Sequence, residues 1–182
     1  MIATAPLPTA QLPTTRWRGT FARLDPAAAD LGQAVLRVTL GAVLLPHGAQ
    51  HLIGWFGGFG FSATLAWMTG ALGFPAPLAA VAIVLEVMAP VALILGIASR
   101  AAGLAMAGFM AVAASTHVAN GFFMNWFGSQ PAGVEGFEYH LLAVAMALTV
   151  AAQGGGAWAI DRLFDGAPRA RTGGPVRTAR RP

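Results

Sequence analysis

The chain has 182 residues, of which 56% are hydrophobic and only 10% are charged, and its formal net charge is +4. Soluble domains carry roughly 25% charged residues, so this composition is typical of an integral membrane protein. The sequence contains no cysteine, which excludes disulfides, thiolate metal sites and iron–sulfur clusters. All basic residues are arginines near the ends of the apolar segments or in the tails, which indicates topology signals rather than a nucleic-acid interface.

Residues 1–30 are predicted to form a disordered cytoplasmic arm. They are rich in Pro, Thr and Ala, and they include Arg16, Arg18 and Arg23. No apolar core precedes a cleavage-like site, so a cleaved signal peptide is not expected. The Asp25-Pro26 pair is a start signal for the first helix.

The first apolar segment, residues 31–53, is long enough to cross a bilayer, because a helix rises 1.5 Å per residue and this one would span roughly 33 Å. Arg37 lies near its start. His47 and His51 lie near its end and are four residues apart, so they share one face of a helix. Imidazoles near the end of a hydrophobic span are costly unless they have a role.

Residues 54–75 follow as a glycine and aromatic segment suited to a membrane interface. Ser62 is predicted to cap a short amphipathic helix over residues 63–72 that lies on the membrane surface. Gly73-Phe74-Pro75 is predicted to end it.

Two further spans are predicted over residues 76–97 and 101–119, joined by a short turn that contains Arg100. The first carries Glu86 near its centre and Pro90 one turn later. The second carries a stripe of mostly small residues, which favours close helix packing in membranes: Gly103, Ala107, Met110, Ala114 and His117.

A glycine- and aromatic-rich connection, residues 120–137, leads to a fourth and shortest span over residues 138–153. Residues 31–161 are thus predicted to form one all-α domain, an integral membrane four-helix bundle with a short interfacial helix between the first two spans. Residues 162–182, rich in Arg, Gly and Pro, are predicted to be a disordered basic tail.

The arginines predict the topology. They lie in the N-terminal arm, in the turn at Arg100 and in the C-terminal tail, apart from Arg37 inside the first span, and the connections 54–75 and 120–137 contain none. By the positive-inside rule, both termini are expected in the cytoplasm of a multi-pass protein of the bacterial inner (plasma) membrane.

This topology brings the polar side chains of the spans towards the outer half of one bundle, where bundles build sites from inward-facing residues. Glu86, His47 and His117 are the predicted catalytic residues. A carboxylate at bilayer depth needs a partner, and for Glu86 that partner is expected to be His47, His51 or His117. His51, Glu138, Tyr139 and Arg37 are the predicted cofactor-binding residues. Arg37 has a second interpretation, a side chain that extends to the cytoplasmic interface.

His140 is interpreted as a polar residue at the lipid headgroups. It lies nearly opposite Glu138 on the helical wheel, so the two side chains cannot face the same core.

The predicted cofactor is left open. A quinone needs a donor such as His or Tyr, a carboxylate that exchanges protons, and aromatic walls, all of which are present. Haem is the weaker alternative, because it needs two histidines on facing helices, such as His51 and His117. No metal site is predicted, since the His47–His51 pair lacks the acidic neighbour of a zinc hydrolase.

The ordered part, residues 31–161, resembles the DoxX family of small four-helix bacterial membrane proteins. The resemblance rests on the order and spacing of several short motifs: Arg37-x3-Gly41, His47-Gly48, Gly54-Trp55-Phe56-Gly57-Gly58, Glu86, Gly96-x2-Ser99-Arg100, His117-x3-Gly121-Phe122-Phe123 and Gly136-Phe137-Glu138-Tyr139. Family members commonly carry lysine where this chain has His51.

The resemblance implies a membrane protein linked to redox complexes, since the related protein DoxD is the membrane subunit of a thiosulfate:quinone oxidoreductase. The first hypothesis is a quinone-interacting subunit of an oxidoreductase complex that has an enzyme partner. The alternatives are a non-catalytic membrane anchor for a partner enzyme and a small-solute transporter. The expected environment is the lipid bilayer, and no nucleic-acid partner is expected.

Overall fold

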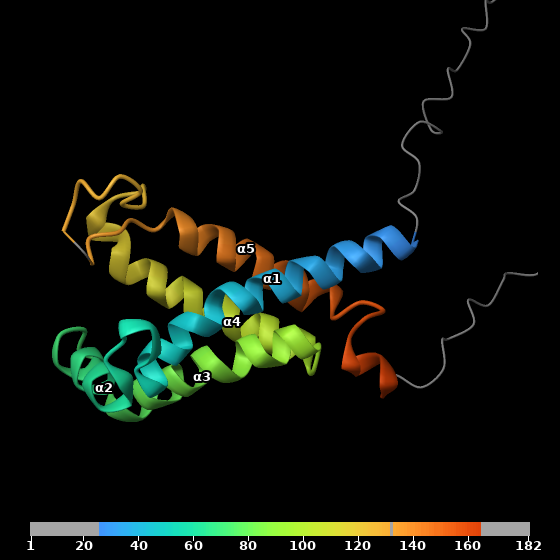
Figure 1. The fold of residues 1–182 in the computed structure, drawn as a ribbon, viewed down its shortest axis with the longest axis horizontal. Coiled ribbons are helices and arrows are strands. Elements are labelled where there is room, and N and C mark those ends of the chain that lie inside the picture. Colours follow the sequence, from blue (N-terminus) through green and yellow to red (C-terminus); the bar gives the residue numbers. More distant parts are fainter. Residues whose placement is uncertain (1–25, 132, 165–182) are drawn as a thin grey trace, which may run out of the picture.

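The computed structural model describes residues 26–131 and 133–164, and every regular element in these ranges is helical (Figure 1). The five α-helices are α1 (Pro26–Ile53), α2 (Gly60–Gly70), α3 (Ala76–Leu95), α4 (Ser99–His117) and α5 (Glu138–Gln153). Short 3₁₀ turns lie at Trp55–Gly57, Val118–Asn120 and Ile160–Leu163. The predicted all-α class is confirmed.

Three segments are long and apolar enough to cross a membrane: Pro26–Ile53, Ala76–Leu95 and Ser99–Asn120. They correspond to the first three predicted spans. The fourth segment, α5, has 16 residues, fewer than the roughly 20 that usually cross a bilayer. The chain is therefore an integral membrane protein by length and composition of its helices.

The helix boundaries differ from the predicted ones mainly at the ends of the domain. Helix α1 begins at Pro26 rather than near residue 31, because proline has no N–H to lose at the first helical position. The last turn continues through Leu163 at the start of the predicted tail. The rest of the predicted arm and tail, residues 1–25 and 165–182, lies outside the described residues.

Helix α2 begins at Gly60, so Ser62 lies inside its first turn and the prediction of a serine cap is wrong. The chain enters the helix through Gly60 at φ +74°, a conformation that glycine adopts without strain. Helix α2 packs against α1 and α3.

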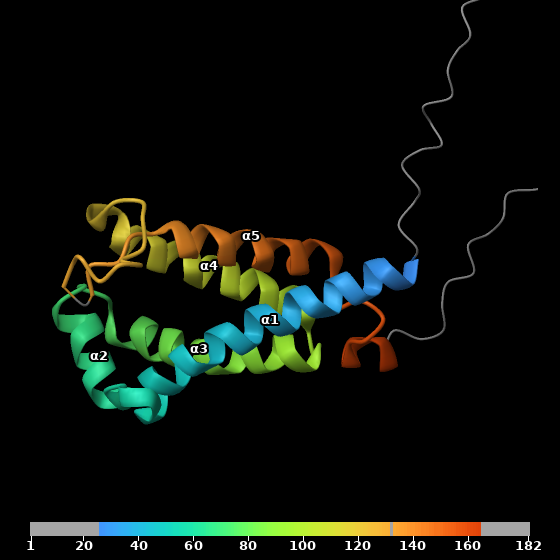
Figure 2. The ribbon, with the colours of Figure 1, turned by 45° about the horizontal axis from the view of Figure 1, so that its top comes forward.

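The helices form two closely packed pairs, α1 with α3 and α4 with α5, and these pairs meet along α3–α4 and α1–α5 (Figure 2). The start of α1, the α3–α4 turn and the Ile160–Leu163 turn lie at one end of the molecule (Figure 1). We call this end the arginine end, because Arg37, Arg100 and Arg162 belong to these segments. Helix α2 and the connection 121–137 lie at the other end, which we call the histidine end.

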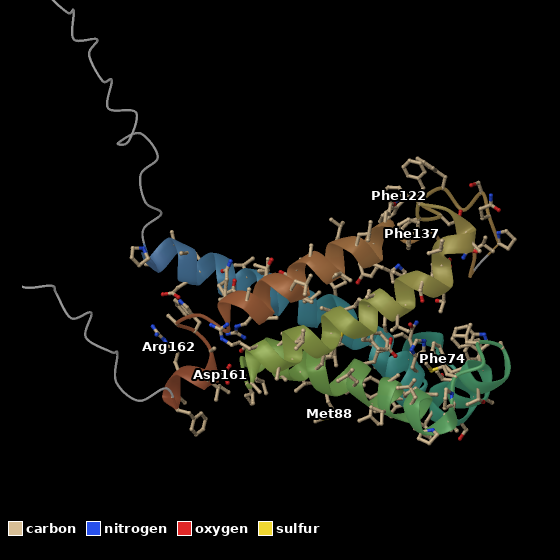
Figure 3. All side chains as sticks on the ribbon, turned by 180° about the vertical axis from the view of Figure 1, so that it is seen from behind. Phe74, Met88, Phe122, Phe137, Asp161 and Arg162 are labelled. Carbon is tan, nitrogen blue, oxygen red and sulfur yellow. The ribbon has the colours of Figure 1, made fainter. Side chains whose placement is uncertain are left out.

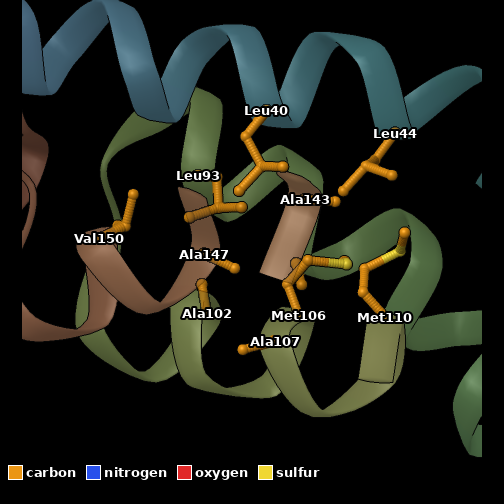
Figure 4. Close-up of a cluster of buried hydrophobic side chains, with 11 residues drawn as sticks. Leu40, Leu44, Leu93, Ala102, Met106, Ala107, Met110, Ala143, Ala147 and Val150 are labelled. Carbon is orange, nitrogen blue, oxygen red and sulfur yellow. The ribbon is translucent and has the colours of Figure 1, made fainter. Parts of the chain in front are cut away.

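The core between the helices consists of apolar stripes that recur with helical periodicity (Figure 4). Small residues bring α4 and α5 together: a Cβ added at Gly103 would lie 2.8 Å from the Ala147 carbonyl oxygen. Gly103, Ala107 and Met110 of the predicted stripe are buried, so this side of α4 packs in the bundle as expected.

Arg37 is the most connected polar side chain of the arginine end, and only 2% of its surface is exposed. Its guanidinium donates to the carbonyl oxygens of Gly155 (3.0 Å), Leu93 (2.6 Å), Ile94 (2.6 Å) and Trp158 (2.7 Å). Two of these carbonyls end α3, where a helix lacks its own donors. Arg37 therefore joins α1 to α3 and to the segment after α5, and it does not extend into solvent.

Asp161 fixes the start of α4. Its carboxylate accepts hydrogen bonds from the backbone N–H groups of Ala98 (2.6 Å) and Ser99 (2.8 Å). These groups have no partner within the helix, and a negative charge is favourable at a helix N-terminus. Burial opposes ionisation of Asp161, but the hydrogen bonds from Ser99 and Ala98 and the nearby Arg37 outweigh it, so its pKa is lowered.

The lowered pKa of Asp161 predicts a pH-dependent contribution to stability. Because the folded-state pKa lies below the unfolded value of about 3.9, the contribution is present above that value and is lost as the pH falls through the folded pKa. We expect Asp161→Asn to cost up to about 1 kcal/mol at pH 7, and we expect this cost to shrink as the pH falls below about 3.9. Thermal unfolding of both proteins in detergent from pH 7 to pH 3 measures this. A deficit that persists unchanged at pH 3 would contradict the electrostatic explanation.

Candidate ligand site

A cavity of about 650 Å³ lies at the histidine end, with walls from all five α-helices. Its surface is mostly apolar, with side chains that include Leu44, Trp67, Phe74, Leu85 and Phe109. Its polar lining residues are His47, His51, Thr64, Glu86, Thr116, His117, Glu135, Tyr139 and His140. An apolar cavity of this size with a few polar groups is typical of small-molecule sites.

The shortest hydrogen bond between side chains of the described cavity lining joins α1 to α3. His51 Nδ1 lies 2.6 Å from Glu86 Oε2, and Glu86 is only 8% exposed. The partner that Glu86 requires in the membrane is thus His51, which the sequence offered as one of three histidines. His47 also lines the cavity, one helical turn earlier.

The contact between Glu86 and His51 depends on a close approach of the two backbones. A Cβ added at Gly48 would collide with the Glu86 carbonyl group, so only glycine fits there. That carbonyl lacks its usual helical donor, which would be the N–H of residue 90, because residue 90 is a proline. The close contact of Gly48 with the Glu86 carbonyl group therefore sets the distance between α1 and α3 beside the site.

A second imidazole pair joins α4 to α5. The ring centroids of His117 and His140 are 4.6 Å apart, and His140 is 8% exposed. The interpretation of His140 as a headgroup residue is therefore wrong. His140 lines the cavity and Glu138 does not. This agrees with the helical wheel, on which the two residues lie on nearly opposite sides of the helix.

Glu138 holds the connection between α4 and α5. Its carboxylate accepts hydrogen bonds from the Met124 backbone N–H (3.0 Å) and from the Trp126 indole N–H. Met124 and Glu135 from this connection line the cavity. Glu138 thus supports one wall indirectly. Figure 3 shows where this connection joins α5 at Phe137.

Two buried polar atoms of the lining have no hydrogen-bond partner of standard geometry within the described residues: Thr64 Oγ1 and His140 Nδ1. A buried polar atom without a partner costs about 1–3 kcal/mol. Sequence reasoning did not select either residue. Thr64 lies on a short helix that was predicted at the membrane surface, so no signal marked it as buried.

The structure brings five of the seven predicted site residues to one cavity: Glu86, His47, His117, His51 and Tyr139. Arg37 and Glu138 do not line it, for the reasons given above. Within residues 26–131 and 133–164, no group of three or more His, Asp or Glu residues is arranged to hold a metal ion.

Comparison with known proteins identifies the family. No curated protein and no solved structure matches the chain significantly. The model of the DoxX family matches residues 32–126, which cover more than half of the chain and include most of α1 and all of α2 to α4. The matched region contains the His51–Glu86 pair and His117, whereas His140 lies beyond it. The chain therefore belongs to the DoxX family.

Proposed function

We propose that this protein is the quinone-interacting membrane subunit of an oxidoreductase complex in the bacterial inner membrane. The observation that carries the proposal is the apolar cavity with the buried Glu86 in its wall, hydrogen-bonded to the half-buried His51. A carboxylate at this depth is expensive unless it has a role.

The cavity suits a flat, apolar ring with polar substituents. Trp67, Phe74 and Phe109 supply aromatic surface, and His51 supplies a hydrogen bond. The lining continues to Val81 on α3 and Val112 on α4, which are 62% and 50% exposed on the outside of the bundle. A quinone with an isoprenoid tail could leave that tail between these helices, in contact with lipid.

The chain's own residues would bind the ring and manage protons. A bound quinone would supply the redox chemistry, and the electrons would come from or go to an enzyme partner. His51 and Glu86 share a short hydrogen bond, so a proton can move between Nδ1 and Oε2 as the charge on a ligand changes. His47 lies one turn away on the same helix and would extend the hydrogen-bonding surface.

The proposed arrangement in the membrane has four crossings, with α5 as the fourth and α2 near the headgroups. Helix α5 runs beside α4 along the bundle, and Gly154–Trp158 would add the length that its 16 residues lack. The segments that contain Arg37, Arg100 and Arg162 lie at the same end as both described ends of the chain. By the positive-inside rule, we propose that both termini lie in the cytoplasm.

A membrane anchor for a partner enzyme is the second candidate. It is favoured by the large apolar side chains that the histidine end exposes outside the cavity, among them Phe59 (84%), Phe123 (76%) and Phe127 (96%). Such a patch can lie in the lipid interface or contact a protein. An anchor without chemistry would keep its partner when Glu86 is changed.

The test of the proposed function is quinone binding by the full chain in lipid nanodiscs. We expect a short-tailed benzoquinone to bind saturably and Glu86→Gln to weaken binding about tenfold or more, because the change disrupts the charge-assisted bond that orients His51. In a reconstituted complex, the same change should abolish quinone-dependent turnover. Asp30→Asn at the arginine end is the matched carboxylate-to-amide control. Unchanged binding in Glu86→Gln would refute the assignment.

A further inference from the structure

The position of one proton in the cavity follows from the surroundings of His117. Its Nδ1 lies 2.9 Å from the Ala113 carbonyl oxygen, which can only accept, so Nδ1 must carry the hydrogen. Thr116 Oγ1 donates to the same carbonyl (2.8 Å) and lies 3.1 Å from Nδ1, where its lone pair can share that hydrogen. A neutral imidazole has a single N–H. The other nitrogen of His117, Nε2, is therefore a hydrogen-bond acceptor.

His51 has the opposite polarity. Its Nδ1 lies 2.6 Å from Glu86 Oε2. A carboxylate beside a neutral imidazole would leave an uncompensated charge in the membrane, which is costly. The two arrangements without net charge are an imidazolium with a carboxylate, and a neutral imidazole that accepts from a carboxylic acid. In both of them Nε2 carries a hydrogen, so this nitrogen of His51 is a donor.

The two walls of the cavity thus differ: the α1–α3 wall offers a donor, and the α4 wall offers an acceptor. We propose that the cavity selects a lipid-soluble aromatic ligand with hydroxyl groups, a phenol or hydroquinone, over the corresponding carbonyl compound. A hydroxyl can both accept from His51 and donate to His117, whereas a quinone oxygen can only accept. This inference rests on the proposed function, because it concerns the same site and specifies which form of the ligand binds there.

The hydroxyl group of Thr64 is a third polar group that could bond to a ligand that both donates and accepts hydrogen bonds. Thr64 Oγ1 is buried in the cavity wall, its residue is 4% exposed, and it has no partner among the described residues. A hydroxyl on threonine can pair with either polarity. It would gain the hydrogen bond that it lacks from any polar substituent within reach.

The experiment compares three probes of nearly equal size on the unmodified full chain in nanodiscs: decyl hydroquinone, its quinone and its dimethyl ether. Binding is measured by equilibrium dialysis under reducing or oxidising conditions, and it is corrected for partition into nanodiscs without protein. We expect the hydroquinone to bind about fivefold more tightly than the quinone and the ether, since one net hydrogen bond is worth about that factor.

Variants locate the preference. His117→Phe keeps a ring but removes the acceptor, so it should bring hydroquinone affinity down to that of the quinone and leave quinone affinity within about twofold. His117→Gln, whose side-chain oxygen can accept, should restore part of the preference. Ser115→Ala is the control on the same helix, because Ser115 is exposed and, among the described residues, its hydroxyl bonds to the Val112 carbonyl of its own helix.

Each outcome is decisive. Equal or tighter binding of the quinone to the unmodified chain, or a preference that survives in His117→Phe, would overturn this inference alone. The proposed function would stand in those cases, because a quinone would still bind through His51 and Glu86. Saturable binding of none of the three probes would overturn both.

Discussion

Arg37→Met is expected to eliminate the folded protein. The guanidinium donates four hydrogen bonds to backbone carbonyls and is 2% exposed. Methionine fills much of the volume but donates nothing, so these acceptors lose their partners. At about 1 kcal/mol or more for each, the loss is at least about 4 kcal/mol, a large share of an ordinary net stability. Monodisperse yield and thermal unfolding in mild detergent measure the effect.

Arg100→Met is the matched control for that change. Arg100 also donates to carbonyls, those of Ala151, Ala152 and Gln153 at the end of α5, but its side chain is exposed and water can replace it. We expect a loss below about 1 kcal/mol. Arg37→Lys should not rescue, because an ammonium cannot reproduce the planar set of donors. An Arg37→Met protein as stable as Arg100→Met would refute the structural role.

Gly48→Ala is expected to destabilise the protein by about 3 kcal/mol and to remove ligand binding. The new Cβ would collide with the Glu86 carbonyl group, which belongs to the backbone and cannot turn aside as a side chain can. Helices α1 and α3 must then separate, which places the change at the upper end of overpacking costs. The same movement would break the bond between His51 and Glu86. Chemical or thermal unfolding and the quinone binding assay measure the two effects.

Gly32→Ala makes the same change on the same helix, at a position where the new Cβ meets no described atom within 4 Å beyond its own stretch of helix. It should stabilise the protein by about 0.5–1 kcal/mol, as expected for glycine in an exposed helix interior. We therefore expect Gly48→Ala to lower the free energy of unfolding and Gly32→Ala to raise it. Equal effects would show that the approach of α1 to α3 is not set by Gly48.

The sequence predicted the long helices well, because apolar length and glycine or proline at the ends determine them. The predicted helix at 138–153 coincides with α5 (Glu138–Gln153). The partner of Glu86 was narrowed to three histidines, since a carboxylate in a span requires a partner. Which histidine pairs with Glu86 depends on how far α1 is shifted along α3. That shift is set by the contact at Gly48, and local periodicity does not reveal it.

The roles of Arg37, Glu138 and His140 could not be obtained in this way. Periodicity showed that Glu138 and His140 oppose each other, but not which one faces inwards. The choice depends on the connection 121–137, whose Met124 and Trp126 N–H groups bind Glu138. Arg37 bonds to carbonyls that are 56 to 121 residues away along the chain, so no pattern near it could reveal them.

The contacts of Arg37 also constrain how the protein is made. Helix α1 is synthesised first, yet its arginine finds its last acceptors, Gly155 and Trp158, only after α5 has been synthesised. Until then the guanidinium must be solvated by water or lipid phosphate at the membrane surface, which would hold the early helix in a shallow position. Completion of the chain then allows α1 to settle into its final depth. We therefore expect the helices to pack together only at the end of synthesis. Nascent chains that stop before residue 155 should remain susceptible to quality-control proteases.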